Sequence, residues 1–167
     1  MKGNTMAITT ATGARYFIGG TTAIPYTTDA AAIAAFEALT WVEIKEVEDG
    51  GEVGDESSDV TFQSLGDGRV RHLKGARDAG TIAIVVGDDP LDPGQIAMRA
   101  AEKTKFNHNF KIEYEDAPSE LYENSVDYFR GLVMSARKNI GTGDNVLRRT
   151  FNVGVSTPIL SVDTALA

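Results

Sequence analysis

The sequence predicts one mainly β domain, a sandwich or barrel-like fold with a flanking α-helix and long loops. Several segments alternate apolar and polar residues with a period of two, and glycine-containing turns separate them. The chain has 167 residues, 42% of them hydrophobic, which is the size and apolar content of a domain with its own core. We therefore expect residues 1–167 to form a single domain.

The N-terminal part of the chain changes character twice. Residues 1–28 are rich in Thr, Ala and Gly around one apolar patch at 16–18. They predict a flexible arm that contains a short strand, or an arm that becomes ordered against a neighbour. Asp29 is expected to cap a short helix over 30–39. From Thr40 the alternation has period two, which predicts a strand.

Two adjacent segments carry opposite charge. Residues 43–59 contain eight acids and one base, so they predict a loop or a solvated hairpin, with an acidic loop over 47–60. Residues 69–77 contain four bases and no acid, and a turn at 66–68 precedes them. Such segments attract each other, within one molecule or between molecules. We expect contacts between subunits, with these candidate residues: Glu52, Asp55 and Glu56 on the acidic side, and Arg69, Arg71 and Lys74 on the basic side.

The second half of the chain predicts most of the sheet. Residues 79–86 are the clearest strand, because Ile82, Ile84 and Val86 fall on one face. The sequence Asp-Pro-Gly at 92–94 then starts a helix over 93–104. Three more alternating segments predict strands, at 110–116, 128–137 and 145–155.

The residue composition and motifs of the chain argue against a catalytic, cofactor or metal site. The chain has no cysteine, and His72 and His108 lack the partners of a metal or catalytic site. No glycine motif matches a phosphate loop or a nucleophile elbow. We therefore predict no enzyme, no cofactor and no metal. No apolar run approaches a membrane span. A net charge of −8 opposes simple binding to a nucleic-acid backbone. The single tryptophan, Trp41, is read as a core anchor or as a subunit contact.

Several motifs, in a shared order, resemble the tail tube proteins of lambda-like, long-tailed bacteriophages. The first is LTWVEIKEVE at 39–48, followed by GEVG at 51–54. The second comprises residues 60–70 and KGARDAGT at 74–81. The third comprises GLV at 131–133, NIG at 139–141 and RTFNVG at 149–154. The likeness covers roughly residues 36–155.

The resemblance implies a β-sandwich subunit that assembles into stacked hexameric rings, making a hollow tube in the virion. It implies four kinds of partner: further copies of the chain, the tape-measure protein, tail-tip and tail-terminator proteins, and phage DNA that passes without specific binding. An acidic lumen would repel DNA phosphates. If Phe110, Ile112 and Tyr114 face the core, then Glu113 and Glu115 face the lumen or the outer solvent.

Two other functions remain alternatives. A tube protein of a type VI secretion system would share the architecture and would also stack rings. A soluble binding module with an acidic face would remain a monomer and would never form tubes.

Overall fold

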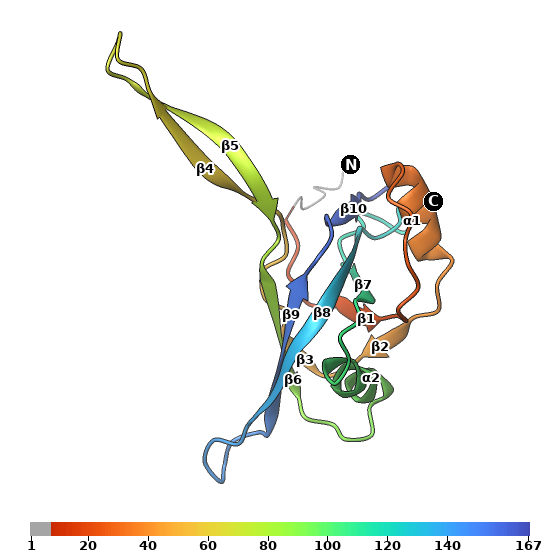
Figure 1. Cartoon of the computed structure of the whole chain (residues 1–167). Helices are drawn as coiled ribbons and strands as arrows, with labels where there is room; N and C mark the ends of the chain where they lie inside the picture. The colour runs from red at the N-terminus through yellow and green to blue at the C-terminus, as the bar shows by residue number, and fades with distance from the viewer. Residues whose placement is uncertain (1–7) are drawn as a thin grey trace.

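The computed structural model describes residues 8–167 as two helices and ten strands (Figure 1). The helices are α1 (Asp29–Glu37) and α2 (Pro93–Glu102). The strands are β1 (Arg15–Ile18), β2 (Val42–Ile44), β3 (Val47–Asp49), β4 (Glu56–Gln63), β5 (Val70–Asp78), β6 (Thr81–Gly87), β7 (His108–Glu113), β8 (Val126–Asn139), β9 (Arg148–Val155) and β10 (Leu160–Val162). The predicted mainly β class is confirmed, and the helix expected at 93–104 is present as α2.

The main sheet is antiparallel and curls back toward itself. Its strand order is β2-β1-β7-β8-β9-β6-β3, and β10 pairs with β8 off this path. The first and last strands of that order are consecutive in the sequence, joined only by Lys45 and Glu46. The two ends of the sheet must therefore lie close together, which makes the body a split barrel around one core.

The N-terminus of α2 closes the split between β2 and β3. The buried side chain of Asp92 accepts hydrogen bonds from the backbone N–H groups of Lys45 (3.2 Å) and Gln95 (2.9 Å). Gln95 Nε2 donates to the carbonyl oxygens of Lys45 (3.2 Å) and Gly87 (2.8 Å). These bonds tie the helix to the β2–β3 connection and to the end of β6, where backbone groups would otherwise lack partners.

Two apolar clusters fill the molecule. The larger lies inside the curled sheet, where Ile82, Ile84 and Phe151 meet Met98 of α2. The smaller lies under α1, where Phe36 stacks on Tyr128 with ring centroids 5.2 Å apart. Thr28, not Asp29, caps α1, because its Oγ1 accepts from the Ala31 N–H at 3.2 Å. Asp29 instead occupies the first turn, where its charge suits the helix dipole.

The expected arm and acidic loop contain regular structure. Residues 1–7 of the arm lie outside the described part of the chain, but residues 15–18 form β1, paired on both sides with β2 and β7. Within the expected acidic loop, 47–60, only residues 50–55 lie outside strands, and the basic segment is largely β5. Dense charge keeps a segment out of a core, but it does not prevent pairing in a hairpin that leaves the body, which is the geometry of β4 and β5.

Candidate assembly surfaces

The hairpin of β4 and β5 projects far from the body (Figure 1). Among residues 8–167 these two strands pair only with each other. Val60 lies directly opposite Leu73, and Phe62 lies two residues further along on the same face. These side chains are 48%, 58% and 55% exposed, respectively. An isolated two-stranded hairpin is marginally stable in water, and here its apolar face is uncovered. The sequence signal for this face is the period-two spacing of Val60 and Phe62, which the acidic neighbours obscure.

The other face of the hairpin and its turn are charged. On that face His72 Nδ1 lies 2.7 Å from Asp59 Oδ2. At the turn, Arg71, which lies opposite Phe62 at the end of the apolar face, pairs with Asp67 at 2.8 Å. Asp67 accepts from the backbone N–H of Arg69 and from Arg71, and these bonds hold the pKa of its carboxyl below the ordinary value.

The six charged residues predicted to join subunits all lie in or beside this hairpin. Asp55 already pairs with Arg77 (3.1 Å) in the same chain, as Arg71 does with Asp67. Within residues 8–167 the other four candidates form no ion pair: Glu52, Glu56, Arg69 and Lys74. Their charges are therefore available to another copy of the chain.

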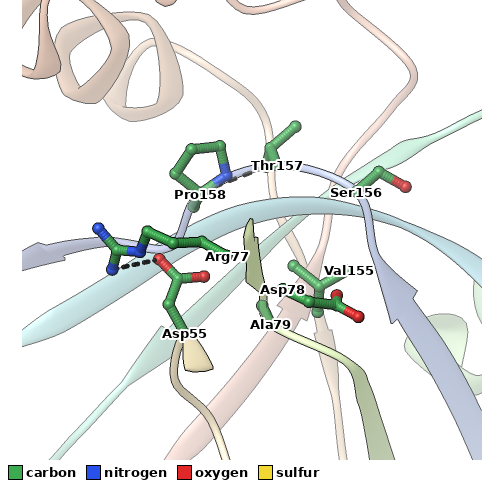
Figure 2. Close-up of a pocket in the computed structure, with 8 residues that line it drawn as sticks. All are labelled: Asp55, Arg77, Asp78, Ala79, Val155, Ser156, Thr157 and Pro158. Atoms are coloured by element: carbon green, nitrogen blue, oxygen red, sulfur yellow. Dashed lines mark hydrogen bonds and ion pairs between the residues drawn. The ribbon is translucent and has the colours of Figure 1, made fainter. Parts of the chain in front are cut away.

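A shallow hollow of about 230 Å³ lies where the hairpin joins the body (Figure 2). One wall is the ion pair of Asp55 and Arg77, and the opposite wall is the segment 155–158. Asp78, which also lines the hollow, accepts a hydrogen bond at Oδ1 from the Gly80 N–H (2.9 Å). The lining pairs no nucleophile with a base, so the hollow has the chemistry of a hinge or contact surface, not of an active site.

In the described part of the chain, the outer surface of β6, β9 and β8 is a second uncovered area. Ile82, Ile84 and Val86 point into the core, so the alternate residues of β6 point outward. Neither helix covers this side, because α2 packs on the core and α1 packs over Tyr128. We call this surface the open face; cross-strand register assigns it Thr81, Ala83, Val85, Ser135, Arg137, Thr150 and Asn152.

Short uncharged side chains dominate the open face. Asn152 Nδ2 donates to Ser135 Oγ at 2.9 Å, and the facing β6 residue is Ala83. Charge appears toward one end only, at Arg137 and at the ion pair of Arg148 with Glu48. The small residues that alternate with core residues in β6 and β9 are the sequence pattern from which this surface could have been predicted.

Glu113 and Glu115 do not lie on the open face. Glu113 pairs with Arg15 in the β1–β7 register, and its carboxylate lies 3.8 Å from Lys111 Nζ. Lys111 in turn covers the ring of Phe17, 4.1 Å from the centroid. This is the side of the sheet on which α1 packs; Glu115 follows the end of β7 and is exposed.

Trp41 packs within the chain at the edge of the smaller cluster. Its ring stacks on Phe36 at 6.5 Å, lies 6.1 Å from that of Tyr128, and remains half-buried. Burial raises the pKa of Tyr128 to about 12. These contacts suit an anchor of α1, while a contact with a neighbouring subunit stays a prediction.

Residues 8–167 contain no group of three or more His, Asp or Glu side chains arranged to hold a metal ion. No helix in this part of the chain is long and apolar enough to cross a membrane.

Comparison with known proteins agrees with this description. A family model described as "Phage tail tube protein, TTP" matches residues 1–159. A chain in the six-fold symmetrised anti-feeding prophage baseplate is 10% identical, with a TM-score of 0.59 over 90% of this chain and 91% of that one. A chain of the SPP1 tail tube is 12% identical, with a TM-score of 0.57 over 92% and 78%. At these identities the structural matches show the fold alone. No curated protein sequence is significantly similar to the chain.

Proposed function

We propose that this chain, which belongs to the phage tail tube protein family and forms the tail tube of the virion, assembles into hexameric rings. The rings stack on one another around an open channel. The protein is a structural component and not an enzyme. Support for the sixfold ring comes from the similar chain of the anti-feeding prophage baseplate, which was solved in a six-fold symmetrised assembly. We further propose that the tape-measure protein fills the channel during assembly and that tail-tip and tail-terminator proteins bind its two ends.

The observation that carries this proposal is the uncovered hairpin. Its apolar face, Val60, Phe62 and Leu73, finds no partner in the described chain, so a second copy is the simplest cover. Three free charges lie along the same hairpin: Glu56 starts β4, Arg69 directly precedes β5, and Lys74 lies on the other face, opposite Asp59. Exposed pairs contribute only about 0–1 kcal/mol each, but they recur at every interface of a polymer and set its register.

The open face is our candidate for the channel wall. It presents hydroxyl, amide and methyl groups without a cluster of Lys or Arg, so DNA phosphates find little to bind. The alternative is that the surface carrying Glu113 and Glu115, at the end of β7, lines the channel. Phage particles that carry Thr81→Lys should eject DNA slowly if the open face lines the channel, whereas Glu115→Lys should then have no effect. The reverse pattern would move the wall to β7.

Imaging of concentrated protein, with and without a tail-tip initiator, tests tube formation. We expect hollow rods of constant width from the wild type. Phe62→Ser combined with Leu73→Ser should melt at the same temperature as the wild type but form no rods. Leu121→Ser, at a 70% exposed site outside the hairpin, is the matched control and should form normal rods. Persistent wild-type monomers under all conditions would favour the soluble acidic module.

Charge reversal tests the predicted ionic contacts separately. Converting Glu52, Asp55 and Glu56 to lysine should block assembly and leave the subunit folded, and reversing Arg69, Arg71 and Lys74 in the same chain should restore part of it. Salt at 1 M should also weaken assembly, since the screening length then falls to about 3 Å. If the triple acidic variant forms normal tubes, the acidic residues make no contact that assembly needs and are only solvated surface residues.

A further inference from the structure

Within residues 8–167, Met134 is the one methionine at the surface. The chain has four methionines, and those at positions 1 and 6 lie outside the described residues. Met98 of α2 is 0% exposed in the larger apolar cluster, whereas Met134 of β8 is 62% exposed. Thiols and thioethers are readily oxidised in proteins, and the chain has no cysteine. Met134 therefore presents the accessible oxidisable sulfur of the described chain.

A β-bulge brings Met134 onto the open face. In the register of β8 and β9, Val133 lies opposite Val153. Ser135 lies opposite Asn152, so Met134 is an extra residue between the two pairs. In such a bulge two successive residues lie opposite one residue of the partner strand, and a side chain is redirected. Ser135 lies on the open face, where its Oγ accepts a hydrogen bond from Asn152, and the bulge allows its neighbour Met134 to share that face.

The position of Gly154 shows which way the Met134 side chain points. Val153 is buried in the core, so the next residue of β9, Gly154, faces the open side. A Cβ atom on Gly154 would lie 3.4 Å from Met134 Cγ and 3.7 Å from its Sδ. Met134 therefore leans over Gly154 on the open face, and this glycine has no side chain that could cover the sulfur.

We propose that Met134 is a methionine-oxidation site on the open face, which in the tube stays accessible to small oxidants but is closed to the enzymes that reduce methionine sulfoxide. This inference rests on the proposed function, in which the open face lines the channel. A peroxide diffuses along such a channel, whereas a folded protein outside the tube does not reach its wall. Assembly therefore makes a reversible modification permanent.

With hydrogen peroxide as the oxidant, one oxygen atom moves to the sulfur. The sulfur lone pair of Met134 attacks one peroxide oxygen, and an S–O bond forms as the O–O bond breaks. The proton of the attacked oxygen passes to the departing oxygen, which leaves as water. The sulfur is oxidised by two electrons and the peroxide is reduced by two, so the product is methionine sulfoxide.

The fold tolerates a sulfoxide at Met134 but not at Met98. At Met134 the added oxygen can point into solvent, because the sulfur lies at an exposed surface over a glycine. An oxygen on the Met98 sulfur would place a polar group in the apolar core without a hydrogen-bond partner. Met98 is therefore an internal reference, since its oxidation reports unfolding, while oxidation of Met134 alone reports the folded surface.

Mass spectrometry of peroxide-treated protein tests the site in the free subunit. Trypsin separates the two methionines into peptides 78–99 and 131–137. The peptide with Met134 should gain one oxygen at least tenfold faster than the peptide with Met98, and the Tm should stay within about 2 °C of the untreated subunit. Met134→Leu, which keeps an apolar side chain of similar size, is the matched control and should gain no oxygen in peptide 131–137. Equal oxidation rates of the two peptides would refute the site.

The reverse reaction tests where the site lies in the tube. Methionine sulfoxide reductases for both epimers are fixed to beads, so that they cannot enter a channel, and are supplied with a thiol reductant. They should remove the oxygen from Met134 in the free subunit. They should leave it in place in intact tubes and remove it once the same tubes have been taken apart.

Oxidation of preformed tubes completes the test. Peroxide should oxidise Met134 in tubes at no less than about one third of its rate in the free subunit, because the channel admits small molecules. A lower rate, or reduction by the beads in intact tubes, would overturn this inference and leave the tube itself standing. Wild-type protein that forms no tubes would overturn the proposed function, and the oxidation of Met134 in the free subunit would still be measured.

Discussion

Replacing Gly94 with alanine should destabilise the subunit more than any other small change in α2. A Cβ atom at this position would lie 2.1 Å from the Glu43 carbonyl oxygen and 2.5 Å from Ile44 Cα, both backbone atoms of β2. Ordinary contact begins near 3.4 Å, so the helix must move away from β2 by about 1 Å. That movement stretches the bonds of Asp92 and Gln95 to Lys45, which close the barrel.

The size of the loss follows from these contacts. Overpacking of this kind costs about 1–3 kcal/mol, and each weakened hydrogen bond about 1 kcal/mol more. The better helix propensity of alanine returns about 1 kcal/mol. We therefore expect Gly94→Ala to lower the free energy of unfolding by about 2–4 kcal/mol, which for a chain of this size lowers the Tm by about 5–15 °C.

Thermal and urea unfolding of the free subunit measure this loss. Gly143→Ala is the matched control, since a Cβ there meets nothing within 4 Å, and its Tm should stay within about 2 °C of the wild type. If Gly94→Ala also melts within that range, the seating of α2 on β2 is not the tight contact described here.

Three further predictions concern other contacts. Hydrogen bonds from Arg149 and, to a smaller extent, Lys138 hold the pKa of Asp88 in the folded protein below its ordinary value. The Asp88 carboxylate therefore stabilises the fold at pH values above the ordinary pKa, and this stabilisation is lost as the pH falls through the lowered pKa. Because the Asp88 side chain is only 4% exposed, Asp88→Asn should lower the free energy of unfolding at pH 7 by about 3–5 kcal/mol. The variant should also lose less stability than the wild type as the pH falls. A variant as stable as the wild type at pH 7 would contradict this prediction. Trp41→Ala should lower the free energy of unfolding of the free subunit by about 2–3 kcal/mol in urea if the ring anchors α1, whereas a loss seen only in assembly would indicate a subunit contact. Residues 50–55 should exchange their amide hydrogens rapidly in the subunit and slowly in the tube, unlike residues 16–18 of β1, which should be protected in both; strong protection of 50–55 in the free subunit would refute a mobile acidic segment.

Local patterns in the sequence were enough to identify most elements. The alternation at 79–86, 128–137 and 145–155 corresponds to β6, β8 and β9, because a strand with one buried face must repeat every two residues. Asp92 followed by Pro93 marks the start of α2 because a cap and a preset φ are local requirements. Composition and motif order likewise pointed to a tail tube protein without reference to any pairing of strands.

Only the tertiary structure decided which surfaces remain free. Nothing near residues 15–18 indicates that they pair with β2 and β7, because such pairing depends on apolar faces that are distant in sequence. The charges of the acidic and basic segments predicted attraction, but the position of the hairpin set which of them are in reach: Asp55 meets Arg77, while Glu56 and Lys74 remain unpaired within the described chain. Glu113 alternates with core residues as expected, yet the sheet curls so that its face lies toward α1 and not on the open side. Periodicity specifies that a strand has two faces, and only the packing of the whole sheet determines what each face meets.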